Sequence, residues 1–484
     1  MAKTLLECWS CIMDDEIMGI IVQQTNQYIE SIKSLFKRDR DAKPTDIVEL
    51  KAFIGLLYLA GVHRGNRQSL EDLWGSDWDG IEKFRLVMNI KRFKFIMRCM
   101  RFDDRSMRNE RRKIDKIAAI RDIFTMFVKN SQKSYSLGQN VTIDEKLEGF
   151  RGRCGFVQYI SNKPNKYGVK IYALVDSQVY CVYNLEIYAG LQPEGPFRLN
   201  NSPSDVVLRL CQPIYQTGRN VTADNWFTSI PLIDELRSKK ISYVGTLKKN
   251  KIEIPLEFLP NKTRVVNSSL FAFKKGCTLV SYVPKKGKSV ILASSLHEDN
   301  SIDLDIGDKK KPCIITFYNG TKGGVDTADK LCASFNVARN IRRWPMVVFF
   351  AMLNISGINA QVIYFGNDQN VIRRKAFLKA LSHALVLPHM ARRSLETSGI
   401  HTGMQQRLKE ITPVDQEQQK EENENVGKRK RCHTCIGQRR LTKYNCKKCK
   451  KPICLMHIEC FCNNCSQILS EIPQDDIDEG MLRF

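Results

Sequence analysis

The sequence predicts a multidomain α/β protein that carries a cysteine-rich metal-binding module near its carboxyl end. Two observations indicate the α/β part: short β-branched and aromatic runs begin near residue 140, and they alternate with segments of helical periodicity. A third observation indicates the module, because eight of the 17 cysteines lie between residues 432 and 465. A chain of 484 residues is long enough for several domains.

The composition indicates a polyanionic partner. The net charge is +24 and the pI is about 9.4, a basic excess typical of proteins that bind nucleic acid or acidic membranes. The first residues lack the apolar stretch of a signal peptide, and the apolar runs at 53–62 and 346–353 are too short to span a bilayer. We therefore expect a reducing compartment, no membrane, and nucleic acid as the partner. A basic protein without such a partner is the plainer alternative.

Residues 1–139 are predicted to form a helical domain. Segments 49–62 and 84–102 place apolar residues three and four positions apart with charges between them, as amphipathic helices do. A second helical part is expected over 336–411, after the α/β domain.

The α/β domain is predicted over 140–249 and 313–335. Its expected strands are VTIDEKL (141–147), VKIYALVD (169–176), VYCVYNLEIY (179–188), NVTADNWF (220–227) and ISYVGTL (241–247). Helices are expected over 205–215 and 230–239, and a turn at Gly323 and Gly324 opens a further helix. Residues 250–312 show no helical period and are predicted to be a β-rich insertion with a hairpin around 285–287.

Residues 412–427 are polar and acidic, which predicts a flexible linker. The cysteine-rich module follows at 428–466, and a tail covers 467–484. The module opens on a basic run of four residues, Lys428, Arg429, Lys430 and Arg431. Such a run is typical of a nuclear localisation signal or of an arm that contacts DNA phosphates, so we expect the protein in the nucleus.

The module contains four pairs of metal-ligand residues, each pair separated by two residues. The pairs are Cys432/Cys435, Cys446/Cys449, Cys454/His457 and Cys462/Cys465. Because four sulfur or nitrogen ligands close one tetrahedral site, four pairs predict two zinc ions. The spacing leaves open whether sequential or interleaved pairs share an ion, and His433 and Cys460 are spare candidates. Eleven Lys and Arg residues and no acid in 428–451 favour DNA over a protein partner.

Four aspartates are placed where they could hold catalytic metal ions. Asp144 lies within one predicted strand, Asp224 ends another, and Asp326 and Asp329 share one face of the helix after the glycine turn. Carboxylates that converge from strands and a helix can hold two Mg²⁺ ions about 4 Å apart, which activate water or a 3′-hydroxyl at a phosphodiester. Taken alone, an aspartate at a strand end is more often a turn former or an ion-pair partner.

Five long motifs resemble the piggyBac transposase family. They are TIDEKLEGFRGRC (142–154), YISNKPNKYGVKIYALVDS (159–177), NVTADNWFTSIPL (220–232), YNGTKGGVDTADKLC (318–332) and RRWPMVVFFAMLNISGINA (342–360). The likeness runs from about residue 45 to about residue 390 and also includes the cysteine-rich end.

The resemblance implies an RNase H-like catalytic core interrupted by a β-rich insertion, flanked by helical dimerisation and DNA-binding parts, with a cross-brace zinc domain at the carboxyl end. It implies that Asp144, Asp224 and Asp326 bind two magnesium ions and that Asp329 is a further required acid. For zinc it implies one site of Cys432, Cys435, Cys454 and His457, and another of Cys446, Cys449, Cys462 and Cys465. Cys460 is then not a ligand.

The implied activity is cut-and-paste transposition by a homodimer. It would cleave double-stranded DNA at transposon terminal repeats, pass through hairpin-ended intermediates and join the ends to TTAA targets. Beside the active site, Lys248, Lys251, Arg151 and Arg153 are expected to contact DNA. Further on, the expected contacts are Arg339, Arg342, Arg343 and Trp344, whose indole could stack on an unpaired base. The alternatives are a solvated loop for the lysines and core packing for Trp344.

Two other functions stay open. Active members of the family often carry a long acidic segment before the helical domain, whereas this chain starts close to that domain. A captured DNA-binding protein that no longer moves DNA is therefore the second hypothesis. A metal-dependent nuclease that cleaves without strand transfer is the third.

Overall fold

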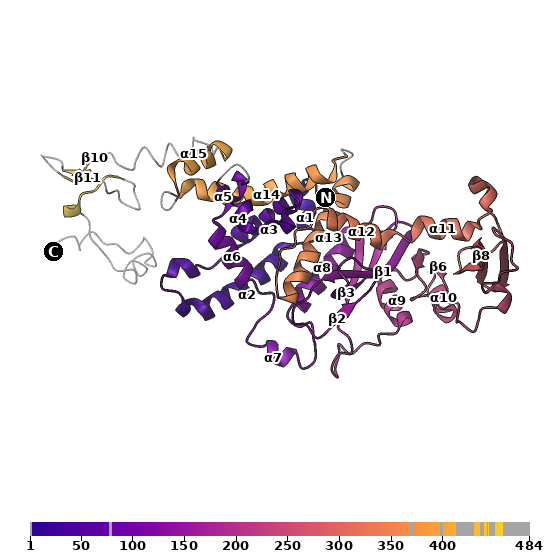
Figure 1. Cartoon of the computed structure of the whole chain (residues 1–484). Coiled ribbons are helices and arrows are strands. Elements are labelled where there is room, and N and C mark those ends of the chain that lie inside the picture. Colours follow the sequence, from indigo (N-terminus) through magenta and orange to yellow (C-terminus); the bar gives the residue numbers. More distant parts are fainter. Residues whose placement is uncertain are drawn as a thin grey trace, which may run out of the picture. The chain divides into compact units, whose positions relative to one another are not determined.

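The computed structural model describes residues 2–76, 80–367, 371–396, 400–412, 430–435, 440–442, 444 and 451–457. The chain forms two compact units, Met1–Leu408 and Lys409–Phe484. The first unit combines a mixed sheet with helices from both ends of that unit, and the second contains the cysteine-rich segment (Figure 1).

The amino-terminal part of the first unit is helical. Its helices are α1 (Leu5–Ser10), α2 (Asp15–Ile32), α3 (Ile47–Val62), α4 (Leu70–Leu73), α5 (Glu82–Val87), α6 (Ile90–Cys99), α7 (Arg108–Arg111) and α8 (Arg121–Ser134). The helix predicted at 49–62 is confirmed as α3. The single helix predicted at 84–102 was wrong, because Asn89 leaves the helical conformation and caps α6 by accepting a hydrogen bond from the Lys91 amide.

Helices from the two ends of the first unit pack into one body. The later helices are α13 (Trp344–Asn367) and α14 (Arg374–Leu395), and α15 (Thr402–Ile411) follows them. The Tyr58 hydroxyl on α3 donates to the Leu353 carbonyl on α13 (2.6 Å), and the Ser382 hydroxyl on α14 donates to the Gly55 carbonyl on α3 (2.8 Å). The two predicted helical parts are therefore neighbours in space (Figure 1).

Helix α13 corrects one expectation about apolar length. Its 24 residues are long and apolar enough to cross a membrane, whereas the apolar run at 346–353 in the sequence is too short to do so. Asn354, Ser356 and Asn359 interrupt the apolar run in the sequence but lie on the same continuous helix. Because 94% of the apolar window is buried inside the protein, α13 is a core helix of this unit.

One mixed sheet organises the rest of the first unit. Its strands are β1 (Asn140–Gly149), β2 (Val157–Tyr159), β3 (Tyr167–Asp176), β4 (Val182–Ile187), β5 (Asn220–Ala223), β6 (Ser242–Thr246), β7 (Ser269–Lys274), β8 (Cys277–Lys285) and β9 (Lys288–Ser294). The order is β2-β3-β1-β5-β6-β9-β8-β7, with β4 also paired to β3. β1 is antiparallel to β3 and parallel to β5, which in turn is parallel to β6.

The predicted strand at 220–227 is shorter than expected. β5 ends at Ala223, and the amides of Phe227 and Thr228 donate to the Asp224 carbonyl, so the chain turns at Asp224. This turn leads into α10 (Ile230–Ser238), while α9 (Pro203–Cys211) precedes β5.

The segment predicted as an insertion at 250–312 extends the same sheet. β9 pairs antiparallel with β6, and β8 and β7 continue outward from it. The predicted hairpin is confirmed by the β8–β9 pair, whose turn contains Gly287 at a φ of 69°, a left-handed conformation that glycine adopts without strain. The insertion and the α/β domain thus share one continuous hydrogen-bonded sheet.

Helices cover the two faces of the sheet differently. Side chains of α9 and α10 pack with Val141, Ile143 and Val221 on one face. The intervening residues Thr142 and Thr222 point to the other face, since side chains alternate along a strand. There they meet the junction between α11 (Cys313–Thr321) and α12 (Gly324–Ser334), two helices where the sequence predicted one closing segment.

Thr321 ties this junction to two strands. The Thr142 hydroxyl donates to the Thr321 carbonyl (2.5 Å), and the hydroxyls of Thr222 and Thr321 lie 2.8 Å apart. Gly324 then lets α12 approach β1, because a Cβ atom there would lie 2.5 Å from Thr142 Oγ1 and 2.9 Å from Thr142 Cβ. These contacts fix the start of α12 against β1.

We expect Gly324→Ala to destabilise the first unit by about 1–3 kcal/mol, because the added methyl overlaps Thr142. Chemical denaturation would measure this loss. Gly320→Ala on α11 is the matched control, since its added methyl meets no atom within 4 Å, and it should be neutral or stabilising by up to about 1 kcal/mol. Equal effects of the two substitutions would contradict the close approach of α12.

Candidate active site and nucleic-acid interface

Asp144 and Asp224 lie side by side on neighbouring strands. Ile143 pairs with Ala223 in the parallel β1–β5 ladder. The residues that follow them, Asp144 and Asp224, therefore lie at the same level and on the face of the sheet that α12 covers. Parallel neighbours are about 4.8 Å apart, which places two carboxylates in one small region. The Trp226 amide donates to Asp224 Oδ1 (2.9 Å), and the Glu145 amide donates to Asp144 Oδ1 (2.8 Å).

Both carboxylates lie in an environment that disfavours their charge. Burial, together with the neighbouring Glu145, raises the pKa of Asp144 to about 8, although Lys163 opposes this shift. Burial also raises the pKa of Asp224, against the opposing charge of Lys248. Clustered acids with raised pKa values lack sufficient positive charge nearby, and a bound divalent cation would supply it.

Helix α12 brings the other two aspartates to the same face. Asp326 is exposed, and its Oδ1 lies 3.5 Å from Lys163 Nζ, which also donates to the Glu145 carbonyl (2.8 Å). Lys163 thus stands beside both Asp144 and Asp326. No feature of the sequence singled it out, since it lies in the loop between β2 and β3.

Asp329 is held by a buried lysine. Lys146 Nζ lies 2.6 Å from Asp329 Oδ1 and 2.9 Å from Glu148 Oε1. Burial raises the pKa of Asp329, although the charge of Lys146 opposes this shift. Burial also disfavours the charge of Lys146, but neighbours that include Glu148 and Asp329 raise the Lys146 pKa well above its ordinary value. Asp329 is therefore committed to an ion pair. Asp144 and Asp224 lie on neighbouring strands, and Asp326 lies beside the lysine that also contacts Glu145, so these three carboxylates remain the candidates for Mg²⁺ ligands.

Basic residues flank the four aspartates. Lys248 follows β6, is exposed, and lies close enough to Asp224 to lower its pKa. Lys251 lies in the same turn, where its amide donates to the Lys248 carbonyl (3.2 Å). Arg151, beyond the end of β1, is exposed and lies 5.9 Å from the Tyr167 ring centroid.

A cavity of about 560 Å³ elsewhere on the first unit is lined by seven cationic side chains. We call it the cationic cavity, and its cations are Arg101, Arg108, Arg112, Lys116, Arg153, Arg342 and Arg343. Among the described residues that line it there is no carboxylate. Trp344 forms one wall and packs edge-to-face on Phe156, with the ring centroids 5.0 Å apart.

The cations of this cavity repel one another. Burial, with Arg101 and Arg108 nearby, lowers the pKa of Arg343 to about 9. Arg108 pairs with Asp103, but within the described part of the chain Arg112, Arg153 and Arg342 make no ion pair. A bound polyanion would relieve this repulsion. Four of the seven cations come from residues 101–116, which carry no sequence signal for DNA binding because they lie far from 342–344 in the chain.

Two of the arginines predicted to contact DNA are used within the protein. Arg339 is only 8% exposed, and its guanidinium donates to the Gly65 and Gln68 carbonyls. Arg343 donates to the Arg98 carbonyl (2.9 Å) and also to Met100, at the end of α6. A DNA contact at Arg339 therefore does not fit this structure, whereas Arg342 is exposed and faces the cationic cavity.

The second unit gathers four metal-ligand side chains. Ligand atoms of Cys432, Cys435, Cys454 and His457 all lie within 4.8 Å of one another. The Cys435 and Cys454 sulfurs are 3.8 Å apart, and His457 Nδ1 lies 3.3 Å from Cys454 Sγ. A tetrahedral zinc ion with bonds of about 2.0–2.3 Å separates its ligands by roughly 3.3–3.8 Å, so these residues fit zinc.

The segments around this cluster are joined by backbone pairing. β10 (Lys430–Arg431) pairs with β11 (Leu441–Thr442), the Cys432 amide donates to the Arg440 carbonyl (2.9 Å), and the Cys454 amide donates to Cys432 Sγ (3.3 Å). The cluster uses the interleaved pairing that the sequence spacing left open. Cys446, Cys449, Cys460, Cys462, Cys465, Lys428 and Arg429 lie outside the described residues.

Comparisons with known proteins agree with this architecture. A family model described as Transposase IS4 matches residues 6–361. The chain is similar to the solved structure of a piggyBac transposase synaptic complex with hairpin DNA, with a TM-score of 0.79, 35% sequence identity, and coverage of 96% of this chain and 97% of that one. The chain belongs to the piggyBac transposase family.

Human members of the piggyBac family are more distant. PiggyBac transposable element-derived protein 3 is 23% identical over 371 residues, covering 72% of this chain and 60% of the relative. PiggyBac transposable element-derived protein 2 is 23% identical over 349 residues, covering 68% and 56%. The chain spans less than two thirds of the length of these curated relatives.

We expect the stability of this piggyBac family protein to fall as pH rises from about 4 to about 8 when divalent cations are absent. Asp144 keeps its proton up to about pH 8 in the folded protein but only to about pH 4 when unfolded, so the folded state binds more protons in this window. Urea unfolding at pH 5 and pH 7.5 in a chelator would measure the change. Asp144→Asn should make this fall in stability smaller; an unchanged pH dependence would contradict the raised pKa of Asp144.

Proposed function

We propose that this chain is a DNA transposase that excises and reinserts DNA by phosphoryl transfer. Four acids on one face of a sheet, in a chain of the piggyBac family, are the observation that carries the proposal. The strand order β4-β3-β1-β5-β6, with β5 parallel to β1 and β6 parallel to β5, supports our proposal of an RNase H-like core. The family and the 35% identical solved structure support DNA cleavage as the class of reaction.

The active site would work by positioning charge. Asp144, Asp224 and Asp326 would hold two Mg²⁺ ions, which supply activation of water or a 3′-hydroxyl and stabilise the leaving oxygen. Thr321 and Gly324 fix the distance of α12 from β1, and Lys146 orients Asp329 through their ion pair. Lys163 and Lys248 add positive charge beside the carboxylates, where a scissile phosphate would approach.

DNA binding follows from the charge distribution. The net charge of +24 and the cationic cavity suit a phosphate backbone, and Lys248, Lys251, Arg153 and Arg342 are the contacts we propose from the first unit. By analogy with the hairpin DNA named for the similar complex, the substrate would be double-stranded terminal repeats with TTAA targets, cut by a homodimer through hairpin-ended intermediates. We also place the protein in the nucleus, where this substrate lies.

The second unit would be a two-zinc domain. The described cluster supports the first site, and Cys446, Cys449, Cys462 and Cys465 would form the second. The basic run 428–431 beside it suits recognition of the transposon ends.

Incubation with Mg²⁺ and a duplex that ends in the element's own terminal repeat beside TTAA tests the activity. We expect nicked and then hairpin-ended products on denaturing gels, and a loss of at least about 1,000-fold in Asp144→Ala, because the metal site loses a ligand. Asp308→Ala, at an exposed aspartate, should cleave as the unchanged protein does. Tight binding without any cleavage would contradict the transposase, and nicking without hairpins would indicate a nuclease.

Zinc content tests the second unit. The full chain should contain two zinc ions by elemental mass spectrometry, and Cys454→Ser should retain only one, because a closed site does not tolerate a missing thiolate. Cys11→Ser, which changes an exposed thiol of the first unit, should keep both. A zinc content that Cys454→Ser leaves unchanged would overturn the assignment.

A further inference from the structure

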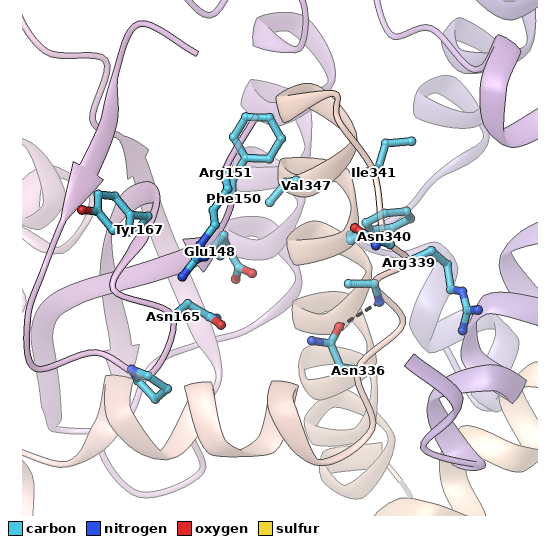
Figure 2. A pocket seen from close by; sticks show the side chains of 14 residues that line it. Glu148, Phe150, Arg151, Asn165, Tyr167, Asn336, Arg339, Asn340, Ile341 and Val347 are labelled. Atoms are coloured by element: carbon cyan, nitrogen blue, oxygen red, sulfur yellow. Dashed lines mark hydrogen bonds between the residues drawn. The ribbon is translucent and has the colours of Figure 1, made fainter. Parts of the chain in front are cut away.

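A second cavity, of about 470 Å³, opens at the far end of β1 (Figure 2). We call it the amide pocket, after the amides of Asn165, Asn336 and Asn340 in its lining. The Glu148 carboxylate and the apolar side chains of Phe150, Val347 and Phe350 complete much of its surface. Its volume falls within the range of about 300–1,000 Å³ typical of small-ligand sites.

The amide pocket lies in line with the aspartates. Asp144, Lys146 and Glu148 alternate along β1, so their side chains share one face of the sheet. At about 3.3 Å per residue, Glu148 lies roughly 13 Å along the strand from Asp144, the length of about four stacked nucleotides. The ion pairs of Lys146 with Asp329 and with Glu148 connect the two places directly.

The lining suits a neutral, flat, polar-edged group. Arg339 contributes to the wall, but Figure 2 shows its guanidinium directed away from Glu148 and Asn165, toward the N-terminal helices, where it donates to the Gly65 and Gln68 carbonyls. Of the described lining residues, only Arg151 then offers a free cation. Asn336 Oδ1 accepts from the Ala338 amide (2.8 Å) and from Asn354 Nδ2 (2.9 Å), which fixes the orientation of its amide.

A phosphate and a nucleobase make different demands on such a site. A phosphate needs several cations, which the cationic cavity has and the amide pocket lacks. A nucleobase needs apolar walls for its faces and both donors and acceptors for its edges, and amides with a carboxylate supply these. The two cavities are lined by consecutive stretches of the same two segments, 148–151 then 153–156 and 338–341 then 342–345.

We propose that the amide pocket receives an unpaired nucleobase of the DNA strand whose phosphodiester lies at the aspartates, while the cationic cavity holds backbone phosphates of the same strand. The inference rests on the proposed function and deepens it. Unpaired bases arise wherever a strand folds back into a hairpin end, and a pocket for one of them would hold the bent strand in register with the acids.

Asn340→Trp tests the proposal, because an indole at this exposed position of the loop before α13 would fill the amide pocket without disturbing the core. The probes are hairpin-ended duplexes with a TTAA loop in which 2-aminopurine replaces each loop base in turn, bound in Ca²⁺. With the unchanged protein we expect a fluorescence change of at least about twofold at one position and little at the others. In Asn340→Trp that change should disappear, and affinity should fall about tenfold, within the range of base–aromatic stacking.

An abasic site provides the decisive control. When the base at the responsive position is removed, Asn340→Trp and the unchanged protein should bind that abasic probe with affinities within about twofold of each other. On a probe with the abasic site elsewhere in the loop, Asn340→Trp should still bind about tenfold more weakly. Asn300→Trp, at an exposed asparagine outside the pocket, should bind every probe normally. The nucleobase pocket would be overturned if no probe position gave a specific fluorescence change, or if every abasic site relieved the binding defect equally. Cleavage by the unchanged protein would still uphold the proposed function in that case. Absence of both binding and cleavage would instead remove the proposed function itself.

Discussion

The contact between α12 and β1 is the constraint on which the rest of the active site depends. Gly324 brings the helix against Thr142, and Thr321 joins β1 and β5 through its carbonyl and hydroxyl. Only with the helix at this distance do Asp326 and Asp329 reach the carboxylates that the strands position. The polar threonines are buried on a face that could have been apolar, so the sheet exchanges some hydrophobic contact for a defined register of helix and strand.

The first unit contains one region of clustered acidic side chains and another of clustered cationic side chains. Burial raises the pKa values of Asp144, Asp224 and Asp329, and the cationic cavity collects arginines whose burial and mutual repulsion lower the pKa values of Arg343 and Arg101. Each arrangement costs folding free energy in the free protein, and a partner of opposite charge would offset that cost: metal ions for the acids and phosphates for the arginines. The buried Lys146 differs from both groups, because two carboxylates of the protein itself pair with its charge.

The parts of the fold and of the candidate site that depend on local residue patterns could be predicted from the sequence. The alternation of β1, the helix α3 and the β8–β9 hairpin follow from residue spacing, and the long motifs by themselves indicate the family. The sequence pattern did not predict the short β5 or the break between α5 and α6, because a turn whose amides donate to the Asp224 carbonyl and a cap at Asn89 decide them. Arg339 looked like a DNA contact because it precedes Trp344 in a basic run, yet its partners lie about 270 residues earlier. Lys163 and residues 101–116 reach their places only through long-range packing, which spacing does not encode.

The packing of α3 between α13 and α14 has a consequence for how the chain is made. The Tyr58 and Gly55 contacts join residues separated by 295 and 327 positions, so α3, which is buried on nearly every side, finds its partners only after most of the chain has been synthesised. Until then the faces of α3 that α13 and α14 cover lack their partners. Such long-range closure favours slow folding, because contacts between residues far apart in the chain carry a high entropic cost before they form.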